Sequence, residues 1–219
     1  MILKTLVVGP LEVNCYIVGD ERAREALCID PGGNTEEILT AISDGGLSLK
    51  YIINTHGHFD HVGGNGQLKK ATGAKLAIHK EDAVLLENLA AQGAVFGLDV
   101  VSSPAPDMLL KDDDKIIIGS ITLRIIHTPG HTPGGISLFI ADYAGFKSGV
   151  EGILFTGDTI FAGSIGRTDL PYGSYEEIIE SIKNKILPLG DNIKLLPGHG
   201  PETTIGREKK FNQFLTDIK

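Results

Sequence analysis

Residues 55–65 of the chain read Thr-His-Gly-His-Phe-Asp-His-Val-Gly-Gly-Asn and follow a short apolar run. Three of the chain's seven histidines fall within six residues of this stretch. In an extended segment residues i and i+2 point the same way, so His56 and His58 can share one metal ion. Asp60 and His61 follow where the chain must turn into a helix, so they can face a neighbouring position. The glycines of this stretch let the backbone come close to a site. This favours a metal centre over the alternative of a histidine cluster in a flexible surface loop.

Three later residues repeat this placement. His131, Asp158 and His199 each come directly after a short apolar run, and each lies beside glycines. In a layered α/β fold the strand ends gather at one edge, and sites form there on rigid supports. We therefore expect these side chains to join the first motif. Together the two groups supply five histidines and two aspartates.

The ligand types indicate the kind of metal. Imidazole and carboxylate without thiolate favour zinc, iron or manganese over a soft metal. Seven ligands are too many for one tetrahedral ion and suit two ions that share a carboxylate, roughly 3.5–4 Å apart, as in metal-assisted hydrolysis. We expect two divalent ions per chain, with zinc favoured and iron or manganese as alternatives.

Composition describes a globular chain. It has 219 residues, of which 42% are hydrophobic and 22% charged, so disorder is excluded as the main state. A formal charge of −8 argues against broad nucleic-acid binding. No run of about 18 apolar residues is present to span a membrane. The first residues lack the cleavage pattern of a signal peptide. Cys15 and Cys28 are expected to be buried thiols. We therefore expect a cytoplasmic protein without nucleic-acid or membrane partners. The oligomeric state stays open.

Hydrophobic periodicity predicts one domain over residues 1–219 with two sheet-building halves. Residues 91–110 have no clean period and are predicted to form a loop or lid. Residues 208–210 are expected on a solvated helix face. The predicted strands are 2–8, 13–19, 25–30, 51–54, 74–78, 115–118, 121–127, 136–140, 152–156 and 193–196, and the predicted helices are one entered at Asn34 or Thr35, then 64–71, one starting near Glu81, 174–186 and 211–218.

The combined motifs resemble the metallo-β-lactamase superfamily. They are THGHFDH at 55–61, GHTPGG at 130–135, TGDTIFAGSIGRTD at 156–169 and LPGHGP at 196–201. Within the superfamily the chain is most similar to the glyoxalase II branch, also called hydroxyacylglutathione hydrolases. The resemblance runs from the N-terminal hairpin to Arg207 and implies an α/β fold, a four-layer αββα sandwich with the metals at one edge.

The resemblance also divides the seven ligands between two ions. Asp158 corresponds to the carboxylate that bridges them, and Asp60 also orients the attacking hydroxide. The ligand set of the first ion is His56, His58 and His131, and that of the second is Asp60, His61 and His199.

The chain departs from typical glyoxalase II enzymes in two places. It ends soon after the last motif, so we expect the C-terminal helical extension that helps hold glutathione to be missing or reduced. The loop after the bridging aspartate reads Gly-Lys-Phe-Tyr in those enzymes and Gly-Arg-Thr-Asp here. Arg167 can replace the lysine or pair internally with Asp169, whereas Asp169 cannot replace the tyrosine. Phe161 and Tyr172 flank this loop and are candidate pocket residues beside Arg167.

These features favour a binuclear hydrolase that cleaves a small-molecule thioester, S-lactoylglutathione or a related small-acyl thioester, by a hydroxide that bridges the metals. The alternative is a mononuclear iron persulfide dioxygenase. Gly-Arg-Thr-Asp also occurs in that branch, whose iron ligands correspond to His56, His131 and Asp158. A non-catalytic metal-binding module is the least favoured reading.

Overall fold

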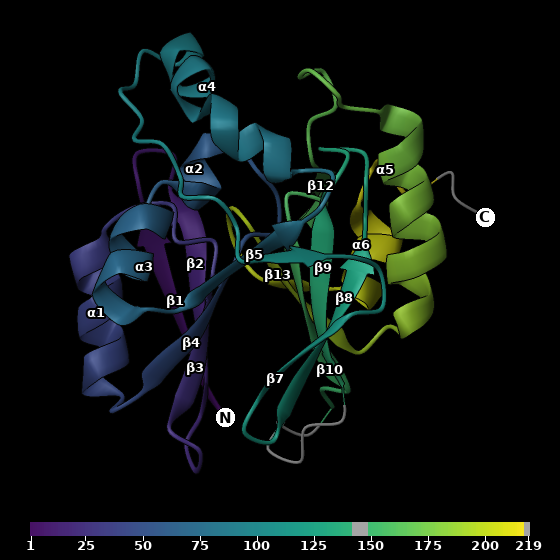
Figure 1. Cartoon of the computed structure of the whole chain (residues 1–219). Coiled ribbons are helices and arrows are strands. Elements are labelled where there is room, and N and C mark those ends of the chain that lie inside the picture. Colours follow the sequence, from purple (N-terminus) through teal and green to yellow (C-terminus); the bar gives the residue numbers. More distant parts are fainter. Residues whose placement is uncertain (142–148, 217–219) are drawn as a thin grey trace. The chain divides into compact units, whose positions relative to one another are not determined.

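The computed structural model describes residues 1–141 and 149–216, and its contacts divide the chain into two compact units. The first unit comprises Met1–Leu110 and Ile117–Ile121, and the second comprises Lys111–Ile116 and Thr122–Lys219 (Figure 1). The single domain expected over residues 1–219 stays a prediction.

The first unit is built on a six-stranded mixed sheet in the order β1-β2-β3-β4-β5-β6. β1, β2 and β3 are antiparallel neighbours, whereas β3 to β6 run parallel. Parallel neighbours need crossover connections, and each of the three crossovers here carries at least one helix. The strands are β1 (Ile2–Val8), β2 (Val13–Asp20), β3 (Glu25–Ile29), β4 (Ser48–Ile53), β5 (Lys75–His79) and β6 (Met108–Leu110).

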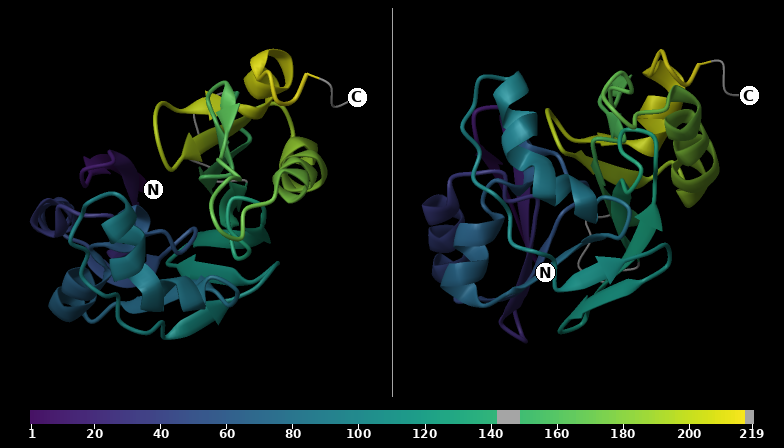
Figure 2. Two further views of the ribbon diagram at one scale, coloured as in Figure 1. Left: turned by 90° about the horizontal axis from the view of Figure 1, so that it is seen from above. Right: turned by 45° about the horizontal axis from the view of Figure 1, so that its top comes forward.

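The helices α1 (Thr35–Asp44) and α3 (Asn65–Thr72) cover one face of this sheet (Figures 1 and 2). Ile38 and Ile42 of α1 and Leu68 of α3 share one core cluster with the strands. Cys15 and Cys28 belong to the same cluster, where both thiols are unoxidised and their sulfur atoms lie 3.4 Å apart. The expectation of two buried thiols is therefore confirmed.

The crossover after β4 carries the short helix α2 (Phe59–Val62), and the crossover after β5 carries η1 (Ala83–Asn88) and α4 (Leu89–Val95). Phe59, Leu86 and Leu89 form a second core cluster there. The predicted loop at 91–110 is therefore wrong at both ends, because α4 continues to Val95 and β6 pairs with β5.

The second sheet has the order β14-β13-β10-β9-β8-β7, with a parallel pair between β10 and β13. The turn between β7 and β8 falls in the first unit. The hairpin β11–β12 follows β10. The strands are β7 (Lys115–Ile118), β8 (Ile121–His127), β9 (Ile136–Ala141), β10 (Gly152–Gly157), β11 (Ile160–Phe161), β12 (Ser164–Ile165), β13 (Ile193–Pro197) and β14 (Thr203–Thr204).

A long helical segment packs on the second sheet. α5 (Tyr175–Ser181) continues into η2 (Ile182–Ile186) and η3 (Leu187–Leu189), and its isoleucines pack with apolar residues of β10 and β13 (Figure 1). The last helix is α6 (Ile205–Phe211), so the helix predicted over 211–218 is misplaced; residues 217 and 218 lie outside the described part. Among the described helices, none is long and apolar enough to cross a membrane.

Candidate metal centre

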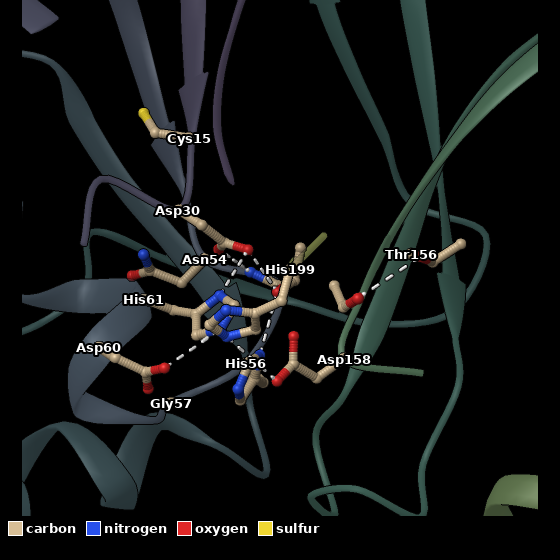
Figure 3. A network of polar contacts seen from close by, with 12 residues as sticks. Cys15, Asp30, Asn54, His56, Gly57, Asp60, His61, Thr156, Asp158 and His199 are labelled. Carbon is tan, nitrogen blue, oxygen red and sulfur yellow. Dashed lines mark hydrogen bonds and ion pairs between the residues drawn. The ribbon is translucent and has the colours of Figure 1, made fainter. Parts of the chain in front are cut away.

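The first group of predicted ligands lies on the turn that leaves β4. His58 has an extended backbone and precedes the first residue of α2, so the chain enters a helix within the motif, as predicted. The ring of His56 lies 4.8 Å from that of His58 and 4.1 Å from that of His61, between centroids. Nε2 of His61 is 3.7 Å from Oδ2 of Asp60 (Figure 3). The structure thus brings together all four predicted ligands of this unit.

A buried aspartate from the neighbouring strand supports these rings. Asp30 directly follows β3, which runs parallel to β4, so its side chain reaches the start of the metal motif. Its carboxylate accepts hydrogen bonds from the main-chain N–H and the hydroxyl of Thr55, both at 2.7 Å. The same carboxylate contacts Nδ1 of His61 at 3.0 Å (Figure 3).

These contacts place a proton on Nδ1 of both His56 and His61. The carboxylate of Asp30 accepts, so Nδ1 of His61 carries the proton. The single hydroxyl proton of Thr55 is donated to Asp30, so its oxygen accepts from Nδ1 of His56, 3.1 Å away. In the neutral form of both rings, the form that binds a metal, Nε2 then carries the lone pair. A metal-ligating histidine characteristically donates its other ring N–H to a nearby oxygen, as these two do.

The second group of predicted ligands follows strands of the second sheet. His131 comes after β8, Asp158 after β10 and His199 after β13. Oδ2 of Asp158 is 3.7 Å from Nε2 of His131. The same oxygen is 3.7 Å from Nε2 of His199 (Figure 3). These separations exceed an ordinary hydrogen bond. They are close to the spacing of about 3.3 Å between two ligand atoms that bind one tetrahedral zinc ion at about 2.0–2.1 Å.

The ring of His131 is oriented by the main chain. Its Nδ1 lies 2.8 Å from the carbonyl oxygen of Arg167. A carbonyl oxygen only accepts, so Nδ1 carries the proton, and in the neutral ring Nε2 then carries the lone pair on the side of Asp158. The donor set of both units, neutral imidazoles and carboxylates, fits zinc, iron or manganese.

Side chains of α6 and of the residue after it hold the loop that follows Asp158 in place. The carboxylate of Glu208 is 1% exposed and accepts hydrogen bonds from the N–H of Gly163 and the hydroxyl of Thr203 at 2.7 and 2.6 Å. Asn212 donates to Glu208 and to the carbonyl oxygen of Ser164. The expected solvated face is therefore wrong at Glu208, whose side chain fixes the tip of the β11–β12 hairpin.

The three predicted substrate residues differ in their surroundings. Arg167 forms a bidentate pair with Asp169 at 2.8 and 2.7 Å, as the internal-pair alternative predicted. This pair lowers the pKa of Asp169 to about 2 and raises the pKa of Arg167. Phe161 lies on β11 with its ring centroid 6.4 Å from that of His199. Tyr172 is 71% exposed, so the structure places it at the surface.

Residues 8–199 match the family model of the Metallo-beta-lactamase superfamily, and the chain belongs to this superfamily. The expected αββα fold class is confirmed by this match and by two similar solved structures. The superfamily binds divalent metals, and the described residues include groups of histidines and aspartates able to hold one.

Individual relatives match over nearly their whole length. Hydroxyacylglutathione hydrolase GloC from Haemophilus influenzae is 40% identical over 217 residues, 98% of each chain. The BLEG-1 B3 metallo-β-lactamase structure is 35% identical with a TM-score of 0.88, covering 98% of this chain and 100% of the other. The structure of TTHA1623 in a di-iron-bound form is 32% identical with a TM-score of 0.84, covering 97% of this chain and all of the other.

Proposed function

We propose that the protein is a binuclear metal-dependent thioester hydrolase acting on S-lactoylglutathione or a related small-acyl thioester. The observation that carries the proposal is the position of the Asp158 carboxylate, which lies equally far from Nε2 of His131 and of His199. One carboxylate between two imidazoles is the arrangement expected of a bridging ligand. The similarity to a protein named hydroxyacylglutathione hydrolase supports the choice of substrate.

In this proposal the seven ligands are divided between two divalent ions. Two bound divalent ions would supply hydroxide near neutral pH and polarise the thioester carbonyl. Zinc is favoured, with iron or manganese as alternatives. Asp158 would be a ligand of both ions. The first ion would be held by His56, His58 and His131, and the second by Asp60, His61 and His199.

The chain's own residues have separate tasks in the reaction. Asp60 accepts the hydrogen bond that orients the attacking water toward the carbonyl carbon. Asp30 keeps the proton on Nδ1 of His61, and the carbonyl oxygen of Arg167 does the same for His131. The leaving thiolate is a weak base, so its departure requires no strong general acid. The products are a 2-hydroxy acid and a thiol.

Arg167 is the proposed anchor for an acidic thiol carrier, and Phe161 lies beside His199 as an apolar contact. Tyr172 is the third proposed substrate residue. Its side chain is exposed, so it would contact the part of a bound substrate that reaches the protein surface. We further propose a cytoplasmic location, in keeping with the two unoxidised cysteines, and a small molecule as partner in place of a nucleic acid or membrane.

A persulfide dioxygenase with one iron is the second candidate, because the Gly-Arg-Thr-Asp loop also occurs in that branch and is compatible with both chemistries. The two chemistries differ in metal count and in their need for oxygen. The test reconstitutes the metal-free protein with zinc or with iron. Three activities are then measured: hydrolysis of a panel of thioesters, oxygen uptake with glutathione persulfide, and hydrolysis of a cephalosporin, which is a β-lactam.

We expect thioester hydrolysis that needs no oxygen and that requires about two metals per chain. The variant Asp44→Asn, which changes an exposed residue of α1, is the control and should retain this activity. Persulfide-dependent oxygen uptake with one iron and no thioester turnover would overturn the proposal. Cephalosporin hydrolysis without thioester turnover would overturn it as well.

A further inference from the structure

Two side chains from the segment after β5 hold the main chain of the metal motif. Asp82 is buried and its Oδ2 accepts a hydrogen bond from the N–H of Gly57 at 2.9 Å. Gln92 of α4 uses both ends of its amide. Its Oε1 accepts from the N–H of Phe59 at 3.0 Å, and its Nε2 donates to the carbonyl oxygen of Gly57 at 3.3 Å.

The two main-chain groups that Gln92 contacts lie on either side of His58. We propose that Gln92 is a positioning residue that presets His58 for metal binding. The proposal rests on the role assigned above to His58 as a ligand. The side-chain amide takes the place of a neighbouring strand, since it accepts from the N–H of one residue and donates to the carbonyl of another two positions away.

The amide of Gln92 is itself fixed. Its Nε2 also donates to the carbonyl oxygen of Leu85 at 3.0 Å, which ties it to η1. Both Nε2 hydrogens and one Oε1 lone pair are then used, so the amide has one favourable orientation. A glutamate at this position would keep the acceptor and lose both donations, and a methionine of similar shape would lose all three hydrogen bonds.

Packing leaves the motif little room to move away from this support. A Cβ atom on Gly57 would lie 2.6 Å from Cβ of Leu85 and 2.9 Å from the carbonyl oxygen of Asp82. Phe59 is buried in the cluster with Leu86 and packs on Phe96, with ring centroids 5.2 Å apart. With the loop already seated by apolar contacts, the hydrogen bonds of Gln92 chiefly fix the direction in which His58 leaves the chain.

The test compares Gln92→Met with Gln67→Met, a control at an exposed glutamine of α3. Two quantities are measured: hydrogen exchange of the Phe59 amide in the metal-free protein, and zinc affinity by competition with a chelator. We expect Gln92→Met to exchange the Phe59 amide at least about 10-fold faster. We expect its zinc affinity to fall about 10–100-fold, the usual effect of losing a group that orients a ligand. The control should change neither.

Gln92→Glu provides a second variant if Gln92→Met fails to fold. It should keep the slow exchange of the Phe59 amide and still weaken zinc binding. Unchanged exchange and zinc affinity in a folded Gln92→Met protein would overturn the inference. A wild-type protein that binds no metal would instead refute the proposed function on which it rests, so the two failures are distinguishable.

Discussion

The carboxylate of Asp30 lies 3.0 Å from Nδ1 of His61, and both side chains are buried. Asp30 sits in the left-handed backbone region, with φ of 52°, which turns the chain out of β3 and aims the carboxylate at the metal motif. Two further hydrogen bonds from Thr55 hold the carboxylate in place. The contact therefore fixes both the tautomer and the ring plane of a proposed ligand.

Replacing Asp30 by asparagine should weaken metal binding at His61. Asparagine tolerates the left-handed backbone, so the fold should survive. Its amide cannot offer carboxylate acceptors to three donors, so the ring of His61 loses its fixed orientation. We expect affinity for the second metal to fall about 10–100-fold, measured by chelator competition. The exposed Asp44→Asn variant is the matched control. If the two variants bind the second metal with equal affinity, Asp30 does not support the metal site.

Loss of the Asp158 carboxylate should affect both metals. A bridging carboxylate balances the charge of two ions at once, so Asp158→Ala should lower the metal content from about two ions per chain to well below one after dialysis. His61→Ala should lose one ion only, because His61 belongs to a single ligand set. Metal analysis of both variants checks this difference. If Asp158→Ala retains one ion at full occupancy, Asp158 is not the bridge.

Asp20 makes the stability of the first unit depend on pH. Its carboxylate accepts from the hydroxyl of Ser120 at 2.6 Å and from the main-chain N–H groups of Ser120, Ala23 and Arg22. The Ser120 hydroxyl, followed by these N–H groups, holds the pKa of Asp20 well below its usual range. A lowered folded-state pKa adds stability above the unfolded value, about 3.9, which is lost as pH falls toward the folded value.

The variant Ser120→Ala tests this linkage. It removes one hydrogen bond to a charged group, so the free energy of unfolding should fall by about 1–3 kcal/mol at pH 7. Protonation of unfolded Asp20 lowers the stability of both proteins equally, so the difference from the wild type should stay the same down to about pH 4 and shrink only as pH falls through the folded-state pKa of Asp20. Urea unfolding at pH 7, pH 4 and pH 2 measures the difference. No difference at pH 7 would show that the Ser120 hydroxyl does not stabilise the carboxylate of Asp20.

Arg167 should act on substrate binding through its side chain alone. Its carbonyl oxygen orients His131, and a change to alanine leaves that main-chain contact in place. Losing one charge-assisted hydrogen bond, about 1.5–3 kcal/mol, should raise KM for S-lactoylglutathione about 10–100-fold with little change in kcat. Asp169→Asn should not raise KM, since it releases Arg167 from its partner. A fall in kcat at constant KM would contradict a binding role.

The four segments that carry the seven proposed ligands could be located in the sequence because each segment follows a strand, namely β4, β8, β10 or β13, and short apolar runs reveal strands locally. The supporting residues could not be predicted in this way. Asp30 contacts a histidine 31 positions away, Gln92 contacts Phe59 across 33 positions, and Glu208 contacts Gly163 across 45 positions. Such partners are set by the packing of elements, which a local pattern does not contain.

The errors in secondary structure have the same origin. The strand β6 is three residues long and is defined by its pairing with β5, so its own sequence gives little signal. The C-terminal helix ends at Phe211 because Asn212 turns to an extended backbone and directs its amide to Ser164 and Glu208. The amphipathic spacing after Phe211 predicted a helix, but the helix ends where Asn212 bonds to Ser164, which lies 48 positions away in the sequence.

The central claim is that two metals act together in thioester hydrolysis. The most direct test adds zinc stepwise to the metal-free protein and follows the rate of S-lactoylglutathione hydrolysis. The proposal predicts that the rate rises until about two equivalents per chain are bound and then stays constant. A rate that reaches its plateau at one equivalent, or no hydrolysis at any zinc level, would contradict it.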